Sequence, residues 1–239
     1  MLETWSQLIK SNLPNTLIIF NPVAGNGRAK DHWPLVEHAL IEAGIHFDVA
    51  ATIAPLEARE LAQQALQKYS QIIAIGGDGT IHEVVNGLMR ASGENETIPL
   101  GVIPLGNGDD FAKMIPPETP IGKRPFDWNT AVQKVVRGQT KLFDVGRISG
   151  DNLRPELGSG PYYFMNSFDV GFGAQSAQNL MTVPTYFKGF SAYLAAIFKT
   201  LINFPNLELS IQLDDQAPFD QSTTITAVMN GRCLWIDSK

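Results

Sequence analysis

The sequence has little cysteine and little charge, and both shortages narrow the class of protein. Cys233 is the only cysteine among 239 residues, so the chain cannot form an internal disulfide, and we expect a reducing compartment. Charged residues make up 18% of the chain, below the roughly 25% typical of globular domains. Apolar residues make up 44%. This composition argues against a disordered chain and allows a sizeable core.

The sequence also lacks a basic surface, a membrane-spanning run and a secretory leader. Lysine and arginine total 18 against 24 acidic residues, a net charge of −6, and no basic stripe indicates a nucleic-acid partner. The longest apolar stretch, residues 186–204, is interrupted by Lys188, Lys199 and Asn203, so it is too polar to cross a bilayer. The N-terminus has no basic region followed by an apolar run. We expect a cytoplasmic protein that meets a membrane only from its surface.

The most informative segment is the peptide IGGDGT at residues 75–80. It follows a short apolar run, residues 72–75, and precedes apolar residues at helical spacing. Glycine lets a ligand approach the backbone closely, and a helix N-terminus directs free N–H groups and a positive dipole end at the same spot. The segment therefore predicts a polyphosphate-binding turn, in which Asp78 holds Mg²⁺ or accepts a proton. The alternative is a tight strand-to-helix turn that merely uses glycine.

Strands and helices alternate through the first part of the chain. Apolar runs predict strands at 16–20, 47–51, 72–75 and 98–103, and helical stripes lie between them, at 35–43, 58–66 and 81–89. This alternation predicts a parallel sheet covered on both faces. Ligands bind such sheets beyond the carboxyl ends of the strands. Three glycine-bearing loops follow strands, 21–27, 76–80 and 105–110, and we expect them to converge on one ligand.

The pattern becomes rich in strands after about residue 140. Strands are expected at 141–146, 162–166, 207–213 and 223–229, with a turn at 214–216 and one helix at 185–203. We therefore expect an α/β fold with two domains. Residues 1–142 form a parallel α/β nucleotide-binding domain, and residues 143–239 form a β-rich, antiparallel, sandwich-like domain that is incomplete.

The glycine loops resemble the catalytic region of the diacylglycerol kinase family, especially the bacterial lipid kinases, and sphingosine kinases share the motif style. Asn21 and Pro22 with Gly25 look like the family's first loop, and residues 76–80 look like its Gly-Gly-Asp-Gly-Thr segment. Residues 104–112 (PLGNGDDFA) are similar to its Pro-Leu-Gly-Thr-Gly-Asn-Asp-Phe-Ala segment. NAD kinases, which are more distant, do not carry this third segment in the same form.

The resemblance implies ATP-dependent phosphorylation of a lipid hydroxyl with Mg²⁺, in phospholipid metabolism. The implied partner is a lipid substrate at the membrane surface, bound through the β-rich domain, and a homodimer is left open. Asp78 is the implied catalytic residue and the candidate metal ligand. The residues expected around ATP are Asn21, Pro22, Thr52, Gly76, Gly77, Asp78, Gly79, Thr80, Ile81, His82, Gly106 and Asn107.

The third loop departs from the family pattern at two positions. Asn107 replaces a threonine and keeps a hydrogen-bonding side chain, whereas Asp109 replaces an asparagine and adds a charge beside Asp110. That charge repels ATP unless Mg²⁺ or a basic side chain compensates, or unless Asp109 points to solvent.

The family's late Asp-Gly-Glu segment, which supplies a catalytic acid, has no match before Lys239. The chain is therefore expected to be a truncated relative, and a missing general base costs ~10²–10⁴-fold in rate. Two rival functions stay open, a catalytically silent nucleotide-binding protein and an NAD-kinase-like enzyme.

Overall fold

A computed structural model describes residues 15–93, 95–115, 127–151, 160–180, 182–184, 186 and 190–231. The chain divides into two compact units, Met1–Asn166 with Asn230–Lys239, and Ser167–Met229. The functional division expected at residue 142 stays a prediction.

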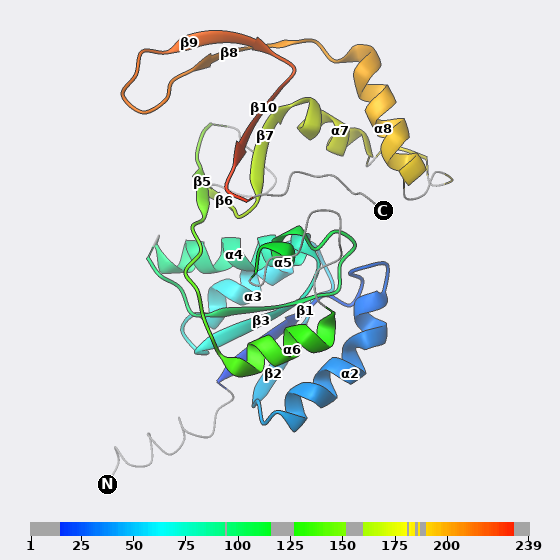
Figure 1. The fold of residues 1–239 in the computed structure, drawn as a ribbon, viewed down its shortest axis with the longest axis vertical. Helices are drawn as coiled ribbons and strands as arrows, with labels where there is room; N and C mark the ends of the chain where they lie inside the picture. Colours follow the sequence, from blue (N-terminus) through cyan, green and yellow to red (C-terminus); the bar gives the residue numbers. More distant parts are fainter. Residues whose placement is uncertain are drawn as a thin grey trace. The chain divides into compact units, whose positions relative to one another are not determined.

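A four-stranded parallel sheet is the centre of the first unit (Figure 1). Its strands are β1 (Thr16–Phe20), β2 (Phe47–Ala51), β3 (Gln71–Gly76) and β4 (Leu100–Pro104), in the order β2-β1-β3-β4. The chain leaves β1 for β2 on one side and then returns to β3 on the other. The strand order therefore reverses at the carboxyl ends of β1 and β3, which is where ligands bind open α/β sheets.

Helices cover both faces of this sheet, as Figure 1 shows. They are α2 (Arg28–Glu42) and α6 (Trp128–Arg137) on one face, and α3 (Glu57–Ala65), α4 (Asp78–Ser92) and α5 (Asp110–Met114) on the other. Alternate strand residues enter the two cores: Ile73 and Ile75 pack with α2 and α6, whereas Ile72 and Ala74 pack with α3 and α4. Burial on both faces explains why the strands are continuous apolar runs.

Two short strands, β5 (Gly146–Ile148) and β6 (Tyr162–Phe164), also belong to the first unit and pair antiparallel. A buried amide, Asn86 on α4, attaches β6 to the α/β layer. Its Nδ2 donates to the Tyr163 carbonyl at 2.9 Å, and the Tyr163 N–H donates to its Oδ1 at 3.0 Å. This exchange satisfies both backbone groups of Tyr163 as a neighbouring strand would.

The described residues of the second unit form two antiparallel strand pairs and two helices. They are β7 (Ser167–Gly171) with β10 (Ile225–Met229), β8 (Leu207–Ile211) with β9 (Phe219–Thr223), α7 (Phe172–Leu180) and α8 (Phe190–Asn203). The turn expected at 214–216 is present, because Asp214 has φ 49° and the Gln216 N–H donates to Leu213 O at 3.0 Å. The predicted α/β fold with a following antiparallel part is confirmed.

Several elements differ from the sequence-based expectation. The prediction of a strand at 141–146 is wrong apart from Gly146, because residues 141–145 have no regular structure. Helices α6 and α7 and strands β7 and β9 were not predicted. Lys188 and Cys233 lie outside the described residues. Within the described parts of the chain, every helix is too short or too polar to cross a bilayer.

Candidate phosphate-binding site

The loops that follow β1 and β3 are joined by hydrogen bonds at the point where the strand order reverses. The Asn21 N–H donates to Ile75 O at 2.9 Å, and Asn21 Nδ2 donates to Thr80 Oγ1 at 3.0 Å. The Asn21 carboxamide also accepts from the Val23 N–H at 3.2 Å, so it shapes the turn that contains Pro22. Asn21 thus fixes the first loop against the first turn of α4.

Helix α4 begins at this point without a side-chain cap. Its N-cap residue, Gly77, is extended, with φ −102° and ψ −171°, and it has no side chain that could cap the first N–H groups. The first turn of a helix has backbone donors without a partner inside the helix, and the macrodipole adds positive charge there. An uncapped N-terminus is therefore suited to bind an anion.

Glycine is found at positions 76 and 79 for two different physical reasons. A Cβ on Gly76 would lie 2.5 Å from Thr80 Oγ1, so this position has no room for a side chain. A Cβ on Gly79 would meet no atom of the described residues within 4 Å, and Gly79 does not have a positive φ. The described part of the chain therefore gives no steric reason for glycine at position 79, and it leaves open space there for a ligand.

The third loop closes on the same turn. The Leu105 N–H donates to Gly76 O at 2.9 Å. A Cβ on Gly77 would lie 2.9 Å from Gly106 Cα, and a Cβ on Gly106 would overlap Gly77 Cα. Together with the Asn21 contacts, this backbone-to-backbone approach confirms that the three loops converge. Asn107 is exposed at the edge of the site.

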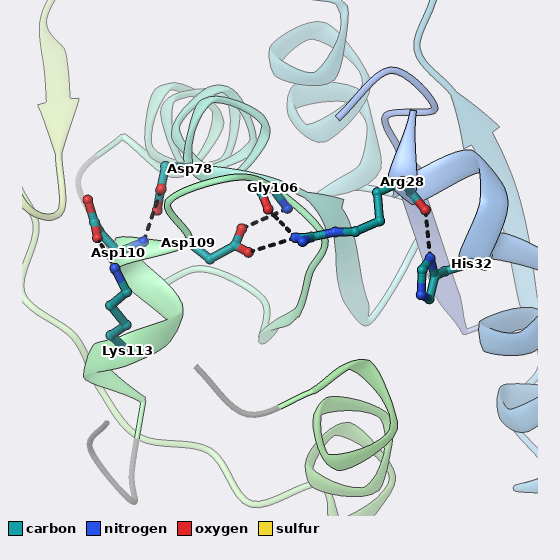
Figure 2. Close-up of polar contacts among 7 residues, drawn as sticks. All are labelled: Arg28, His32, Asp78, Gly106, Asp109, Asp110 and Lys113. Carbon is teal, nitrogen blue, oxygen red and sulfur yellow. Dashed lines mark hydrogen bonds and ion pairs between the residues drawn. The ribbon is translucent and has the colours of Figure 1, made fainter. Parts of the chain in front are cut away.

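Asp78 has a structural partner that the sequence did not reveal (Figure 2). Its Oδ2 accepts from the Asp110 N–H at 3.0 Å, and its Oδ1 accepts from the Phe111 N–H at 2.9 Å. The carboxylate thus supplies the N-terminal cap of α5 from another helix. Each oxygen keeps a further lone pair, so Asp78 is held in place and retains acceptor capacity.

The described residues contain no group of three or more His, Cys, Asp and Glu arranged to hold a metal ion. Asp78 is the first residue of α4, so its carboxylate lies at the N-terminus of this helix.

Asp109 does not point to solvent. It is 4% exposed, it has left-handed backbone angles of φ 55° and ψ 41°, and its Oδ1 accepts from the Gly106 N–H at 2.8 Å. Burial, and to a lesser extent the Asp78 charge, raise the pKa of Asp109 to about 6, although the Gly106 N–H, the Arg28 guanidinium and the Lys113 ammonium act in the opposite direction. Of the alternatives that the sequence left open for this charge, a basic side chain is the one that the structure shows, since Arg28 lies 3.6 Å from Asp109.

Three other expected residues have distinct positions. Thr52 is buried at the end of β2, where its N–H donates to Phe20 O at 2.8 Å. Ile81 is fully buried and packs in the core beneath α4, so its side chain does not face a ligand. His82 is exposed on the first turn of α4, with its Nε2 3.4 Å from Asn86 Nδ2.

Comparison with known proteins identifies the family. The sequence profile described as "Diacylglycerol kinase catalytic domain" matches residues 15–148, which is more than half of the chain. The chain belongs to the diacylglycerol kinase catalytic domain family. The match spans all three glycine loops and extends through β5 of this family member.

Individual relatives agree with this assignment. The chain is 33% identical over 201 residues to a diacylglycerol kinase of Bacillus subtilis (strain 168), covering 82% of this chain and 59% of that protein. It is 31% identical over 147 residues to sphingosine kinase 1 of Arabidopsis thaliana, covering 59% of this chain and 30% of that protein. The chain therefore spans about three fifths of the Bacillus subtilis relative.

A solved structure supports the fold. The crystal structure of a diacylglycerol kinase from Bacillus anthracis str. Sterne has a TM-score of 0.63 and 21% sequence identity, and the alignment covers 95% of this chain and 67% of that chain. At this identity the likeness bears on the fold alone.

Proposed function

We propose that this member of the lipid kinase family transfers the terminal phosphoryl group of ATP to the hydroxyl of a diacylglycerol-like lipid. The observation that carries the proposal is the uncapped N-terminus of α4, with open space beside Gly79. It lies between two loops at the point where the strand order of the sheet reverses. This combination fits a polyphosphate better than any other class of ligand.

In this proposal the backbone N–H groups of residues 78–80 bind the phosphates, and the converging loops fix their orientation. Asn21 holds the first loop against Thr80, and Gly106 holds the third loop against Gly77. Phosphoryl transfer needs little covalent chemistry from the protein, so positioning and charge neutralisation dominate the rate. A site built mainly from backbone groups is suited to that task because it needs no reorganisation during the reaction.

Asp78 has two proposed roles, which share one carboxylate. The free lone pairs of its oxygens hold Mg²⁺ beside the phosphates or accept the proton of the lipid hydroxyl. Mg²⁺, when bound, neutralises the charge of the phosphoryl oxygens. The two N–H groups of α5 fix the orientation of the carboxylate, and α5 thereby contributes to the site.

The proposal includes a peripheral, cytoplasmic protein that meets its lipid at the membrane surface. A homodimer stays a prediction, and sedimentation equilibrium of the purified chain tests it. Flotation with phosphatidylglycerol vesicles tests the membrane association: we expect part of the protein to float with the lipid, and protein that stays wholly at the bottom of the gradient contradicts it.

The direct test is phosphate transfer from ATP to diacylglycerol in mixed micelles, with NAD as a competing acceptor. We expect phosphatidic acid from the wild-type chain and little from Asp78→Asn, which keeps one acceptor oxygen for the α5 cap. In parallel, calorimetry measures the binding of Mg²⁺-ATP to the same proteins. Binding without transfer to either acceptor would favour the silent nucleotide-binding relative, and transfer to NAD alone would favour the NAD-kinase-like alternative.

A further inference from the structure

Arg28 and Asp109 are 81 positions apart in the sequence and meet beside the phosphate-binding turn (Figure 2). Arg28 is the first residue of α2, and Asp109 is the residue before α5. Arg28 Nη2 lies 3.6 Å from Asp109 Oδ2 and also donates to Gly106 O. One guanidinium therefore contacts both the carboxylate and the backbone of the third loop, a geometry that arginine's planar fork allows.

These contacts continue to Asp78. Asp109 Oδ1 accepts from the Gly106 N–H, so Arg28 and Asp109 together satisfy both backbone groups of Gly106. Gly106 in turn lies against Gly77. Asp109 leads directly into α5, and the first N–H groups of α5 hold Asp78. The position of Asp78 thus depends on a loop that Arg28 and Asp109 fix at its other end.

The local charges make this pairing necessary. Three carboxylates lie close together here, since Asp78 belongs to the phosphate-binding turn and Asp109 and Asp110 belong to the third loop. Lys113 pairs with Asp110 at 2.5 Å, and Arg28 contacts Asp109. A buried carboxylate that loses its cation is strongly unfavourable. Without Arg28, the acidic third loop would move toward water, away from Gly77.

We infer that Arg28 and Asp109 are positioning residues, which act as a pair to hold the third loop against the phosphate-binding turn and to keep Asp78 oriented. The inference rests on the proposed function. It assigns Arg28 a role through Asp109 and not as a phosphate ligand. The pair explains how this chain accommodates an aspartate where the family pattern has an asparagine, since an uncharged asparagine would not need the ion pair.

The alternative is that Arg28 binds the nucleotide directly. Its Nε is buried and has no hydrogen-bond partner among the described residues, so the guanidinium has a donor to offer. A thermodynamic cycle separates the two roles because they predict opposite effects of a second substitution. The variants are Arg28→Ala, Asp109→Asn and the double variant. Lys30→Ala is the matched control, since Lys30 is exposed on the same helix and its loss removes the same charge.

Binding of Mg²⁺-ADP, measured by calorimetry, is the first readout. We expect Arg28→Ala to weaken binding about tenfold, and the double variant to recover most of that loss, because asparagine still accepts from Gly106 and carries no charge. Lys30→Ala should bind as the wild type does. A double variant as weak as Arg28→Ala would overturn the inference, since a phosphate ligand cannot be replaced by removing Asp109.

Hydrogen exchange in the absence of nucleotide is the second readout and does not depend on the proposed function. We expect the amides of Gly106, Asp110 and Phe111 to exchange about tenfold faster in Arg28→Ala, while the β3 amides keep their wild-type rates. Unchanged rates at those three amides would also overturn the inference. If the wild type binds no nucleotide but exchange responds as expected, the proposed function fails and the positioning role stands.

Discussion

Replacing Gly79 should separate binding from stability, because a side chain at this position would contact none of the described residues. A Cβ at position 79 meets none of their atoms within 4 Å, and the residue lies in the first turn of α4. Alanine is favoured over glycine in helices by about 0.5–1 kcal/mol. For a chain of this size that gain corresponds to a rise in Tm of roughly 1–4 °C. We therefore expect Gly79→Ala to be at least as stable as the wild type.

The same methyl group occupies the space proposed for phosphate. We expect Gly79→Ala to bind Mg²⁺-ATP more weakly, and Gly79→Val, with a larger side chain, to lose at least about 1.4 kcal/mol of binding, which is tenfold in Kd. Thermal unfolding and calorimetry on the same preparations give both quantities. Gly77→Ala is the contrasting control, because its Cβ would lie 2.9 Å from Gly106 Cα and should destabilise the protein. Wild-type affinity in Gly79→Val would refute the phosphate site.

Three further predictions concern stability. Gly106→Ala should cost about 1–3 kcal/mol in urea unfolding, since the new methyl group overlaps Gly77; wild-type stability would contradict the close approach of the two loops. Asn86→Ala should cost ~2–4 kcal/mol, because it leaves the buried N–H and C=O of Tyr163 unpaired, and an unchanged unfolding midpoint would exclude this role. Asp109 has a pKa of about 6 when folded and ~3.9 when unfolded, so the folded state holds its proton more tightly. The stability associated with that proton is complete below pH ~4 and is lost as pH rises to about 6, by up to ~3 kcal/mol. Asp109→Asn should remove the contribution of Asp109 to the pH dependence of the unfolding free energy between pH 4.5 and 7.5. Equal pH slopes in the variant and the wild type would contradict a raised pKa of the buried Asp109 carboxyl.

The sequence predicted the α/β layer well because its signals are local. Each strand of the sheet is buried on both faces, so the run at 72–75 is continuously apolar, and the glycines after it mark the turn. The antiparallel part was harder to predict. Strand β9 has four exposed residues among five, so no apolar alternation marks it. The segment at 141–145 has apolar residues but no pairing partner in the described structure.

The sequence was enough to predict where the site lies, but not the side-chain contacts within it. The loop motifs named the residues that converge, including Asn21, Gly77 and Gly106. They did not reveal that Asp78 caps α5 or that Arg28 pairs with Asp109, because both contacts join residues far apart in the sequence. The basic residue at position 28 was visible in the sequence, but only the fold brings it beside the acidic loop. The signal that could have found Arg28 was the possibility that a basic side chain compensates the charge of Asp109.

The most direct test of the central claim is a titration of the ¹⁵N-glycine-labelled protein with Mg²⁺-ATP, followed by amide NMR. The account predicts saturable shifts at Gly77, Gly79 and Gly106, whose amides surround the α4 N-terminus. Gly138, at the far end of α6, should not move. Two results would contradict the claim that this turn binds phosphate. In the first, signals of other glycines move while those of the three site glycines do not; in the second, no glycine signal moves at saturating nucleotide.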